Sequence, residues 1–393
     1  MSGDICIHNA VVFNGYSMMK NCAVLIRNDK IVDVFNEERF SQKKFSEGTR
    51  FIDAKGCSIA PGFIDTHIHG FGGYGTEDCS VKSILKMSEG LAKWGVTSFI
   101  PTLYSEKKDK MIRGIRAIVK AMGKETGAKI LGMHLEGPFI SPDRLGVQSP
   151  DTISPVDLDL MEELWNASEG HIINMTLAPE IKNMRELALY CISKGIVMQA
   201  GHTNATYKQM IEGMQARIMH VTHLFNAMSR MHHRDPGAVG AVFIHPELSC
   251  EIIADGIHID SEIIKFLLTC KSLDKVVLVT DALKPTKQKH GPLLANGEEV
   301  YLDKCFYRKS DKVIAGSALT MIDSVKNIVS YGFRLEEAIH MASTNPARIM
   351  KQDNLGVIAP GYDADLVMLS DKLKIKYTII KGKIYEKGKL VCA

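Results

Sequence analysis

The sequence lacks the features that would place it in a membrane or in an oxidising compartment. None of its apolar runs approaches the about 18 residues that a membrane-spanning helix needs. The first residues, MSGDICIHNAVVFNG, contain no basic segment followed by an apolar run, so we expect no secretory signal. Nine cysteines are scattered without a C-x-x-C pair, and an odd number favours reduced thiols over a disulfide framework. These absences predict a cytoplasmic protein with no membrane partner.

The sequence also lacks an excess of charge of one sign. Its 48 basic and 45 acidic side chains leave a net charge of +3. A nucleic-acid-binding surface needs clustered lysine and arginine, whereas the basic stretch at 372–389 alternates with apolar residues, as in the solvated face of strands. We therefore expect no nucleic-acid partner.

The two ends of the chain are rich in short β-branched runs. Such runs, separated by Asn, Gly and Asp, predict antiparallel strands at residues 4–13, 22–27, 30–35, 364–369, 375–380 and 383–385. Neither end is long enough to bury a core alone. We therefore expect residues 1–57 and 354–393 to meet in one small β-sandwich domain.

The middle of the chain alternates between short apolar runs and stretches with helical spacing. Eight runs can be counted between residues 59 and 281: SIAPGFIDTH, TSFIPT, KILGMHLEG, IINMTLAPE, IVMQAGHT, RIMHVTHLF, SCEIIADG and VVLVTDA. The helical stretches include residues 81–94, 107–122, 184–194, 261–270, 318–331 and 335–342. Alternation of this kind predicts an α/β fold with a parallel sheet, and eight units predict a (β/α)8 TIM-type barrel over residues 58–353.

Many of the apolar runs end in a residue that can bind a metal ion. In chain order these residues are His67, His69, Glu136, His202, His223 and Asp281. The C-terminal ends of barrel strands meet at one mouth, and alternation along a strand puts His67 and His69 on the same face. Each residue alone has an ordinary structural explanation, such as a histidine satisfied within a strand or a carboxylate capping a helix. Their coincidence at strand ends predicts a site for two divalent cations.

The same placement argument separates these residues from the other histidines. His220 precedes His223 by three positions, so alternation turns it away from the mouth. His134 shares the face of Glu136 but lies one step deeper, which favours a place behind the ligands. We expect structural roles for His8, His171, His245, His290 and His340.

Several longer segments carry a family resemblance. They are APGFIDTHIHG (60–70), GMHLEGPFISP (132–142), AGHTNATY (200–207), THLFNAMSRMHHRDPGAVGA (222–241), IADGIHI (253–259), VTDA (279–282), AGSALTM (315–321) and GVIAPGYDADLVML (356–369). Along nearly its whole length the sequence resembles N-acetylglucosamine-6-phosphate deacetylases of the amidohydrolase superfamily. The resemblance implies hydrolysis of N-acetyl-D-glucosamine 6-phosphate to glucosamine 6-phosphate and acetate. It also implies a set of metal ligands, with Glu136 bridging: His67, His69, Glu136, His202 and His223.

Asp281 would be the catalytic acid/base in this resemblance. Bound divalent metal lowers the pKa of its water towards about 7 and stabilises the oxyanion. Asp281 would take a proton from that water and pass it to the departing sugar nitrogen. Histidine and carboxylate ligands suit zinc, iron, manganese or cobalt alike. No G-x-S-x-G motif is present, so a serine nucleophile is not indicated.

The resemblance assigns the substrate to other residues. Arg234, His258 and the backbone at Asn226 and Ala227 match phosphate-binding positions, and both guanidinium and free backbone N–H groups suit that anion. Without the resemblance, Arg234 would be read as a surface arginine. Gln148 stands where many members carry a histidine that polarises the acetyl carbonyl; an amide can donate a hydrogen bond there but cannot be protonated. Members are typically homodimers, in which Arg234 would reach the neighbouring subunit's site.

Three alternatives remain open from the sequence. The substrate could be the galactosamine epimer, or the chain could catalyse another amidohydrolase reaction such as opening a cyclic amide. Cyclic-amide hydrolases commonly use a carboxylated lysine on the fourth strand, where IINMTLAPE offers none. A non-catalytic sugar-phosphate-binding protein could share the fold, but such relatives usually lose ligands, and here all six residues are present.

Overall fold

The larger part of the molecule is a barrel of eight parallel strands. The structure is a computed structural model and describes residues 4–392. The barrel strands follow one another in chain order: β6 (Phe63–Ile68), β9 (Val96–Tyr104), β11 (Met133–Glu136), β12 (Ile172–Leu177), β13 (Val197–Ala200), β14 (His220–Val221), β15 (Ser249–Ile253) and β16 (Val276–Val279). The ring closes where Ile68 bridges Ala282 and where the Asp281 N–H donates to the His67 carbonyl at 2.9 Å. The predicted (β/α)8 barrel is confirmed.

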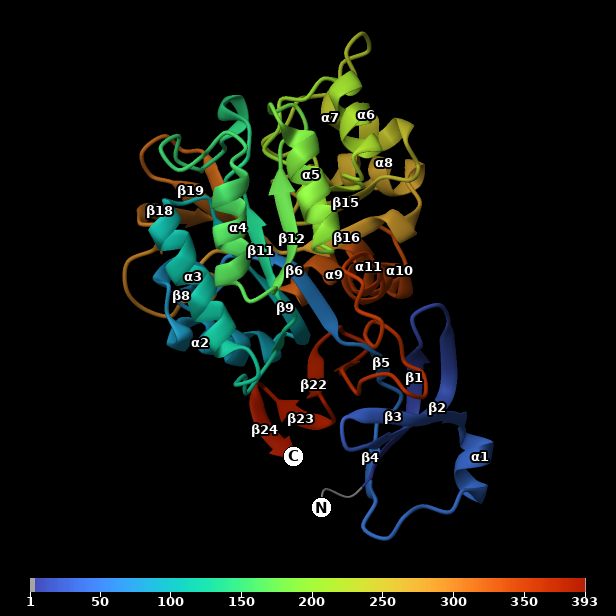
Figure 1. Ribbon diagram of the computed structural model, residues 1–393. Coiled ribbons are helices and arrows are strands. Elements are labelled where there is room, and N and C mark those ends of the chain that lie inside the picture. Colours follow the sequence, from blue (N-terminus) through green and yellow to red (C-terminus); the bar gives the residue numbers. More distant parts are fainter. Residues whose placement is uncertain (1–3, 393) are drawn as a thin grey trace.

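Helices surround this barrel (Figure 1). They are α2 (Val81–Ala92), α3 (Lys108–Ala121), α4 (Leu158–Ala167), α5 (Met184–Ser193), α6 (Tyr207–Gln215), α7 (Gly237–Ile244), α8 (Ser261–Cys270), α9 (Met321–Ser330), α10 (Leu335–Ile339) and α11 (Asn345–Ile349). In α3, Met111, Ile115 and Ile118 recur at helical spacing and are buried against the barrel. No helix among residues 4–392 is long and apolar enough to cross a membrane.

Two of the predicted helices differ from the observed ones. The stretch expected from residue 318 begins only at Met321, because the Thr320 side chain and N–H bond to Asp323 and cap the helix there. The stretch expected at 335–342 is divided by a π-helical turn at His340–Thr344, after which α11 begins. Both differences depend on hydrogen bonds that periodicity does not report.

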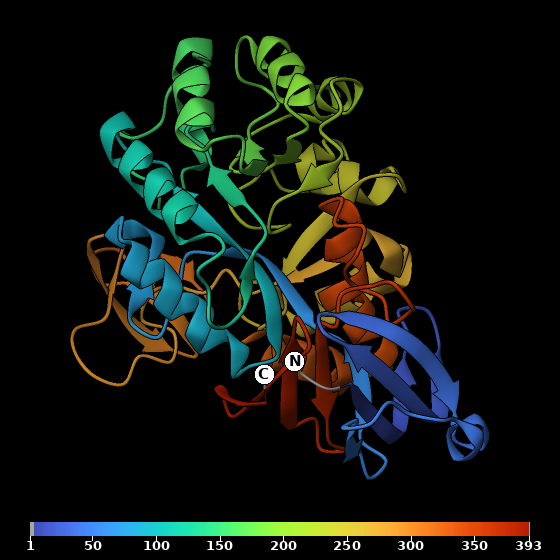
Figure 2. The same cartoon turned by 60° about the horizontal axis from the view of Figure 1, so that its bottom comes forward.

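The two ends of the chain meet in a second, smaller domain, shown in Figure 2 by the blue and red strands lying side by side. Its sheet runs in the order β24-β23-β22-β21-β5-β1-β2-β3, with β4 paired to β1. The strands are β1 (Ile5–Phe13), β2 (Met18–Arg27), β3 (Lys30–Asn36), β4 (Arg50–Asp53), β5 (Ser58–Pro61), β21 (Leu366–Leu369), β22 (Ile375–Ile380), β23 (Lys383–Glu386) and β24 (Lys389–Cys392). A short helix, α1 (Glu37–Gln42), follows β3.

The small domain is held by a core that both chain ends supply. Val24 and Ile31 from the N-terminal strands share one buried cluster with Leu366 and Ile379 from the C-terminal strands. The ends join where β5 pairs antiparallel with β21, Ile59 facing Met368. The predicted extent of this domain includes residues 1–3 and 393, which lie outside the described residues.

A small antiparallel sheet follows the eighth barrel strand and was not anticipated. It consists of β17 (Leu294–Ala295), β18 (Glu298–Asp303), β19 (Cys305–Arg308) and β20 (Ile314–Gly316). A minor core that includes Leu283, Val300 and Phe306 supports it. A hairpin of β7 (Gly70–Phe71) and β8 (Tyr74–Gly75) also follows β6. The last residues of β20 lie at the mouth of the barrel.

Candidate active site

A cavity of about 280 Å³ opens at the C-terminal ends of the barrel strands. We call it the mouth pocket. Its lining comprises His69, Tyr104, Glu136, Gly146, Val147, His202, His223, Asn226, Ala227, His258, Asp281, Val313, Ile314, Ala315 and Gly316. Five of the six predicted metal-binding residues therefore share one cavity, and the sixth, His67, is fully buried next to it.

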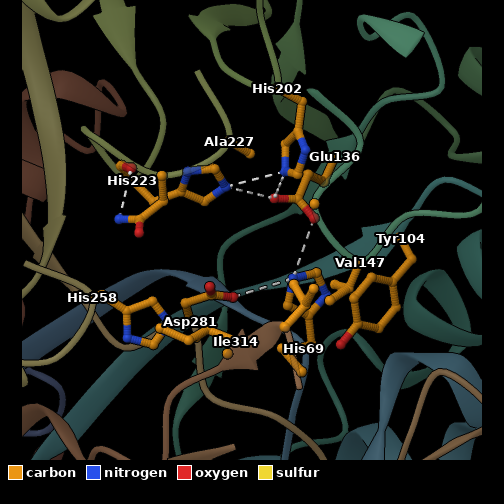
Figure 3. A pocket seen from close by; sticks show the side chains of 15 residues that line it. His69, Tyr104, Glu136, Val147, His202, His223, Ala227, His258, Asp281 and Ile314 are labelled. Carbon is orange, nitrogen blue, oxygen red and sulfur yellow. Dashed lines mark hydrogen bonds and ion pairs between the residues drawn. The ribbon is translucent and has the colours of Figure 1, made fainter. Parts of the chain in front are cut away.

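Glu136 lies at the centre of the predicted ligands (Figure 3). Its Oε1 is 3.2 Å from Nε2 of both His202 and His223, while its Oε2 is 3.4 Å from Nε2 of His69. His67 Nε2 lies 3.3 Å from Glu136 Oε1. A carboxylate between two groups of imidazoles is the arrangement needed to bridge two cations.

Asp281 completes the group that β6 supplies. Its Oδ1 lies 3.4 Å from His69 Nε2 and 3.6 Å from His67 Nε2. The ligand atoms of His67, His69 and Asp281 all lie within 4.8 Å of one another, as do those of His67, Glu136 and His223. Asp281 can thus contact a cation and remain open to the pocket.

In two of the histidines, the Nδ1 atom is already hydrogen-bonded to another residue. His67 Nδ1 lies 3.1 Å from Glu251 Oε2, and His202 Nδ1 lies 3.0 Å from the Arg144 carbonyl. Both acceptors favour a proton on Nδ1, which leaves the Nε2 lone pair for a metal. His67 Nε2 is buried and has no hydrogen-bond partner among the described residues. These residues fit a divalent cation.

The electrostatics of the metal-free site follow from this crowding. Burial alone would raise the pKa of Glu136, but His202 and His67 hold that pKa well below its usual range. Burial opposes protonation of His67 and His202, yet Glu136 raises the pKa of both imidazoles. Because protons and metal ions compete for the same nitrogens, the negative charge that favours a proton here also favours a cation.

The backbone turns sharply where the strand ends present their ligands. His202, His223 and Asp281 have φ values of 45°, 25° and 47°, a region that residues other than glycine seldom adopt. Such conformations cost on the order of 1–3 kcal/mol each and cluster at functional sites. Gly201 is required beside them, because a Cβ there would lie 2.7 Å from the Thr222 Cβ.

The residues predicted to bind the substrate are only partly brought together. Asn226, Ala227 and His258 line the mouth pocket, and His258 Nδ1 lies 2.6 Å from Asp255 Oδ2. His258 lies beside Asp281 in the pocket (Figure 3). Arg234 lies outside the pocket, in an exposed loop between β14 and α7.

Gln148 is held directly against the central carboxylate. Its Nε2 donates to Glu136 Oε2 at 2.7 Å, and its Oε1 accepts the Ser105 N–H at 3.2 Å. These two bonds fix the orientation of the amide, with nitrogen towards Glu136. A side chain predicted to face the substrate therefore also contacts a predicted metal ligand.

Sequence reasoning missed two residues that contact the ligands. Glu251 lies behind His67, and its signal was a single charge inside the apolar run of β15. Tyr104, at the end of β9, stacks on the His69 ring with centroids 3.8 Å apart and planes 9° apart. Its signal was a polar aromatic residue at the end of the second strand.

His134 lies where alternation placed it, whereas His220 was expected to turn away from the mouth and instead faces the barrel interior, its Nε2 3.8 Å from Glu251 Oε1. His134 is buried behind the ligands, 3.2 Å from Thr102 Oγ1 and 2.8 Å from Thr176 Oγ1. Burial lowers its pKa well below the usual value, so the ring is neutral. His220 is buried as well, and its Nδ1 lies 2.7 Å from Ser249 Oγ.

Known proteins are similar to this chain in sequence and in architecture. The N-acetylglucosamine-6-phosphate deacetylase of Lysinibacillus sphaericus is 32% identical over 97% of each chain. The N-acetylgalactosamine-6-phosphate deacetylase of Escherichia coli O157:H7 is 30% identical over 83% of this chain and 87% of its own. The crystal structure of N-acetylglucosamine-6-phosphate deacetylase from Pasteurella multocida superposes with a TM-score of 0.90 at 30% identity, covering 98% of this chain and all of the other.

The family assignment rests on most of the chain. The sequence profile of the amidohydrolase family matches residues 58–385, which include the barrel and all six predicted metal-binding residues. Members of this family use divalent metal for hydrolysis, which agrees with the imidazoles and carboxylates gathered at the mouth. The chain belongs to the amidohydrolase family.

Proposed function

We propose that this protein is a metal-dependent deacetylase that hydrolyses N-acetyl-D-glucosamine 6-phosphate to D-glucosamine 6-phosphate and acetate in amino-sugar metabolism. The observation that carries the proposal is Glu136, whose carboxylate lies between His202 and His223 on one side and His69 on the other. Relatives that match nearly the whole chain are deacetylases of this sugar phosphate.

The mechanism uses these side chains in fixed roles. We propose that His67, His69 and Asp281 would hold one divalent ion and His202 and His223 a second, with the Glu136 carboxylate within reach of both groups. When bound, such ions would supply an activated water and a positive charge for the developing oxyanion. Asp281, exposed to the pocket, accepts a proton from the nucleophile and returns it to the sugar nitrogen as the amide breaks.

The remaining lining residues orient the substrate. We propose that the backbone at Asn226 and Ala227 and the imidazole of His258 bind the sugar phosphate, since all three face the mouth pocket. Asp255 accepts from the His258 N–H groups and so holds that ring in place. Gln148 keeps one amide hydrogen beyond its bond to Glu136, and we propose that it orients the acetyl group.

The position of Arg234 favours a homodimer. Its loop is exposed, carries Met231, 53% exposed, and leads into α7, which contacts α8 through the stacked rings of Phe243 and Phe266. Three further apolar side chains are exposed on those helices: Ile244, Ile263 and Phe266. We propose that this surface pairs two copies and that Arg234 reaches the phosphate in the partner's pocket. We also propose a cytoplasmic location, where the thiols of the chain would stay reduced.

The galactosamine epimer is the second candidate. A relative that acts on that epimer is 30% identical to this chain, almost as similar as those that act on the glucosamine compound. The two sugars differ only in the configuration of one hydroxyl group.

The test is acetate release by purified, metal-analysed protein on both epimers, each with and without the 6-phosphate. We expect the highest kcat/KM for N-acetylglucosamine 6-phosphate. A higher value for the galactosamine compound would reassign the substrate. Absence of acetate release from every compound by metal-loaded protein would exclude the proposed deacetylation and leave a non-catalytic binding protein or another amidohydrolase reaction. The same samples, loaded with zinc, iron, manganese or cobalt, identify the ion that supports turnover.

A further inference from the structure

Glu251 is a fully buried carboxylate in the interior of the barrel. It lies in the middle of β15, with none of its surface exposed. Its Oε2 is 3.1 Å from His67 Nδ1 and also accepts the His223 N–H at 3.4 Å. Its Oε1 accepts from Thr66 Oγ1 at 3.3 Å and lies 3.8 Å from His220 Nε2.

A carboxylate in this position is costly unless its partners compensate. Removing an ionised group from water is unfavourable by several kcal/mol, and a barrel interior is ordinarily filled with branched apolar side chains. The neighbours of Glu251 along the strand, Cys250 and Ile252, are apolar and buried. Packing alone therefore does not explain the charge.

The contacts of Glu251 connect the two halves of the predicted metal site. His67 lies in β6 and donates its side chain, whereas His223 follows β14 and donates its backbone N–H. The strand β15 neighbours β14, whereas β16 lies between β15 and β6, so the carboxylate reaches past one strand to contact His67. One side chain thus restrains a ligand from each half.

We propose that Glu251 is a positioning residue that keeps the proton of His67 on Nδ1 and directs its Nε2 to the metal ion. The negative charge behind the ring also makes Nε2 a stronger ligand, as carboxylate–histidine pairs do at metal sites generally. The inference rests on the proposed metal site. It adds that occupancy of the half supplied by β6 depends on a residue that touches neither metal nor substrate.

Two substitutions separate charge from volume. Glu251→Gln keeps the size and one acceptor oxygen but removes the charge, and Glu251→Met removes both acceptors. Gln199→Met is the matched control, because Gln199 is equally buried in β13, two strands away from β15, and among the described residues its oxygen accepts only from Thr222 Oγ1. Loss of any buried polar group in the interior would affect the control as well.

The measurement is zinc affinity of the full-length protein by competition with a chromophoric chelator. Outer partners of ligand histidines typically change metal affinity by about 10- to 100-fold. We expect Glu251→Gln to weaken one of two bound ions by about that factor and Glu251→Met by more, while Gln199→Met binds both as wild type does. The 15N resonances of His67 in the zinc-loaded protein should show a proton on Nδ1 in wild type and a mixed or reversed tautomer in Glu251→Met.

Three outcomes would overturn the inference. If folded Glu251→Gln keeps both ions at wild-type affinity and the His67 tautomer is unchanged, Glu251 is structural although the proposed function stands. If Gln199→Met loses an ion to the same extent, general loosening of the barrel explains the effect. If wild type binds no divalent ion, the proposed metal site fails together with this inference. Should Glu251→Met not fold, Glu251→Gln alone decides, because it preserves the volume.

Discussion

At the scale of single residues, the chemistry depends on which side-chain atoms are already hydrogen-bonded and which remain available to a metal ion or the substrate. His67 and His202 are held through Nδ1, so their Nε2 atoms point at Glu136. Gln148 is held through both amide atoms. Asp281 is the least enclosed of the predicted ligands, and a proton can therefore travel through it to and from the pocket.

Replacing Asp281 tests the proton transfer. Asp281→Asn keeps an oxygen for the metal but cannot accept a proton, so we expect kcat to fall by at least about 100-fold with metal content and substrate binding largely intact. Steady-state kinetics with elemental analysis of the same sample measure both. A variant that retains its metals and near-wild-type kcat would remove Asp281 from the acid/base role.

Metal binding should depend on pH in a defined direction. In the metal-free site Glu136 raises the pKa values of His67 and His202. Both rings therefore stay protonated at pH values above the ordinary histidine pKa of about 6.5. A metal ion must displace those protons, and its affinity should therefore rise with pH beyond neutrality and fall as the pH is lowered. Calorimetric titration in buffers of different ionisation enthalpy should show proton release at pH 7. Release of no protons would contradict these raised pKa values.

At the scale of elements, the site is assembled from two groups of strand ends. The end of β6 supplies His67 and His69, whose rings are 5.3 Å apart, and β13 and β14 lead into His202 and His223. Between them β11 contributes Glu136. Because each group has its own imidazoles, the two halves should be separable by substitution.

The double substitution His67→Ala with His69→Ala tests this separation. We expect metal content to fall from about two ions per chain towards one and turnover to decrease, because His202, His223 and Glu136 still hold the second ion. Elemental analysis after dialysis gives the stoichiometry. The matched control is His171→Ala, which should leave the stoichiometry unchanged because His171 precedes β12 at the end of the strand opposite the mouth pocket. Two ions retained by the double variant would show that the His-x-His pair is structural.

At the scale of the whole molecule, the barrel supplies a fixed mouth and the loops above it decide access. The small sheet β17–β20 brings residues 313–316 over the pocket. Arg234 lies in another loop, which is exposed and outside the mouth pocket. In the proposed homodimer, assembly of two chains would complete the phosphate site.

Arg234→Ala tests the phosphate assignment. Loss of a charge-assisted bidentate partner in a partly buried site costs on the order of 2–4 kcal/mol. We expect kcat/KM for the 6-phosphate to fall by about 30- to 1,000-fold, with little effect on the slow hydrolysis of unphosphorylated N-acetylglucosamine. Equal losses on both substrates would mean that Arg234 has a structural role.

Mixed dimers of Arg234→Ala and Asp281→Asn chains then test whether Arg234 of one chain acts in the pocket of its partner. If Arg234 acts on the partner's pocket, one site in each mixed dimer contains both intact residues, and activity returns when the two inactive proteins are mixed. If Arg234 acts on its own chain, neither site is complete and no activity returns. Sizing chromatography of the wild type checks the dimer itself.

The sequence by itself determined the barrel, the pairing of the two chain ends and the residues at the strand ends. Hydrophobic periodicity is a local property, so it places β6, β9 and α8 within a few residues. Strand alternation is local as well, and it placed His67 and His69 on one face and His134 behind Glu136. These inferences needed no knowledge of distant contacts.

Only the tertiary structure decided what lies behind and above those ligands. Glu251 meets His67 across 184 positions of sequence, and Tyr104 stacks on His69 only because β9 pairs with β6. The positive φ values at His202, His223 and Asp281 depend on how the closed barrel holds each strand end. Arg234 lies in an exposed loop outside the mouth pocket. Contacts of this kind arise when the ring closes, and no local pattern of residues contains them.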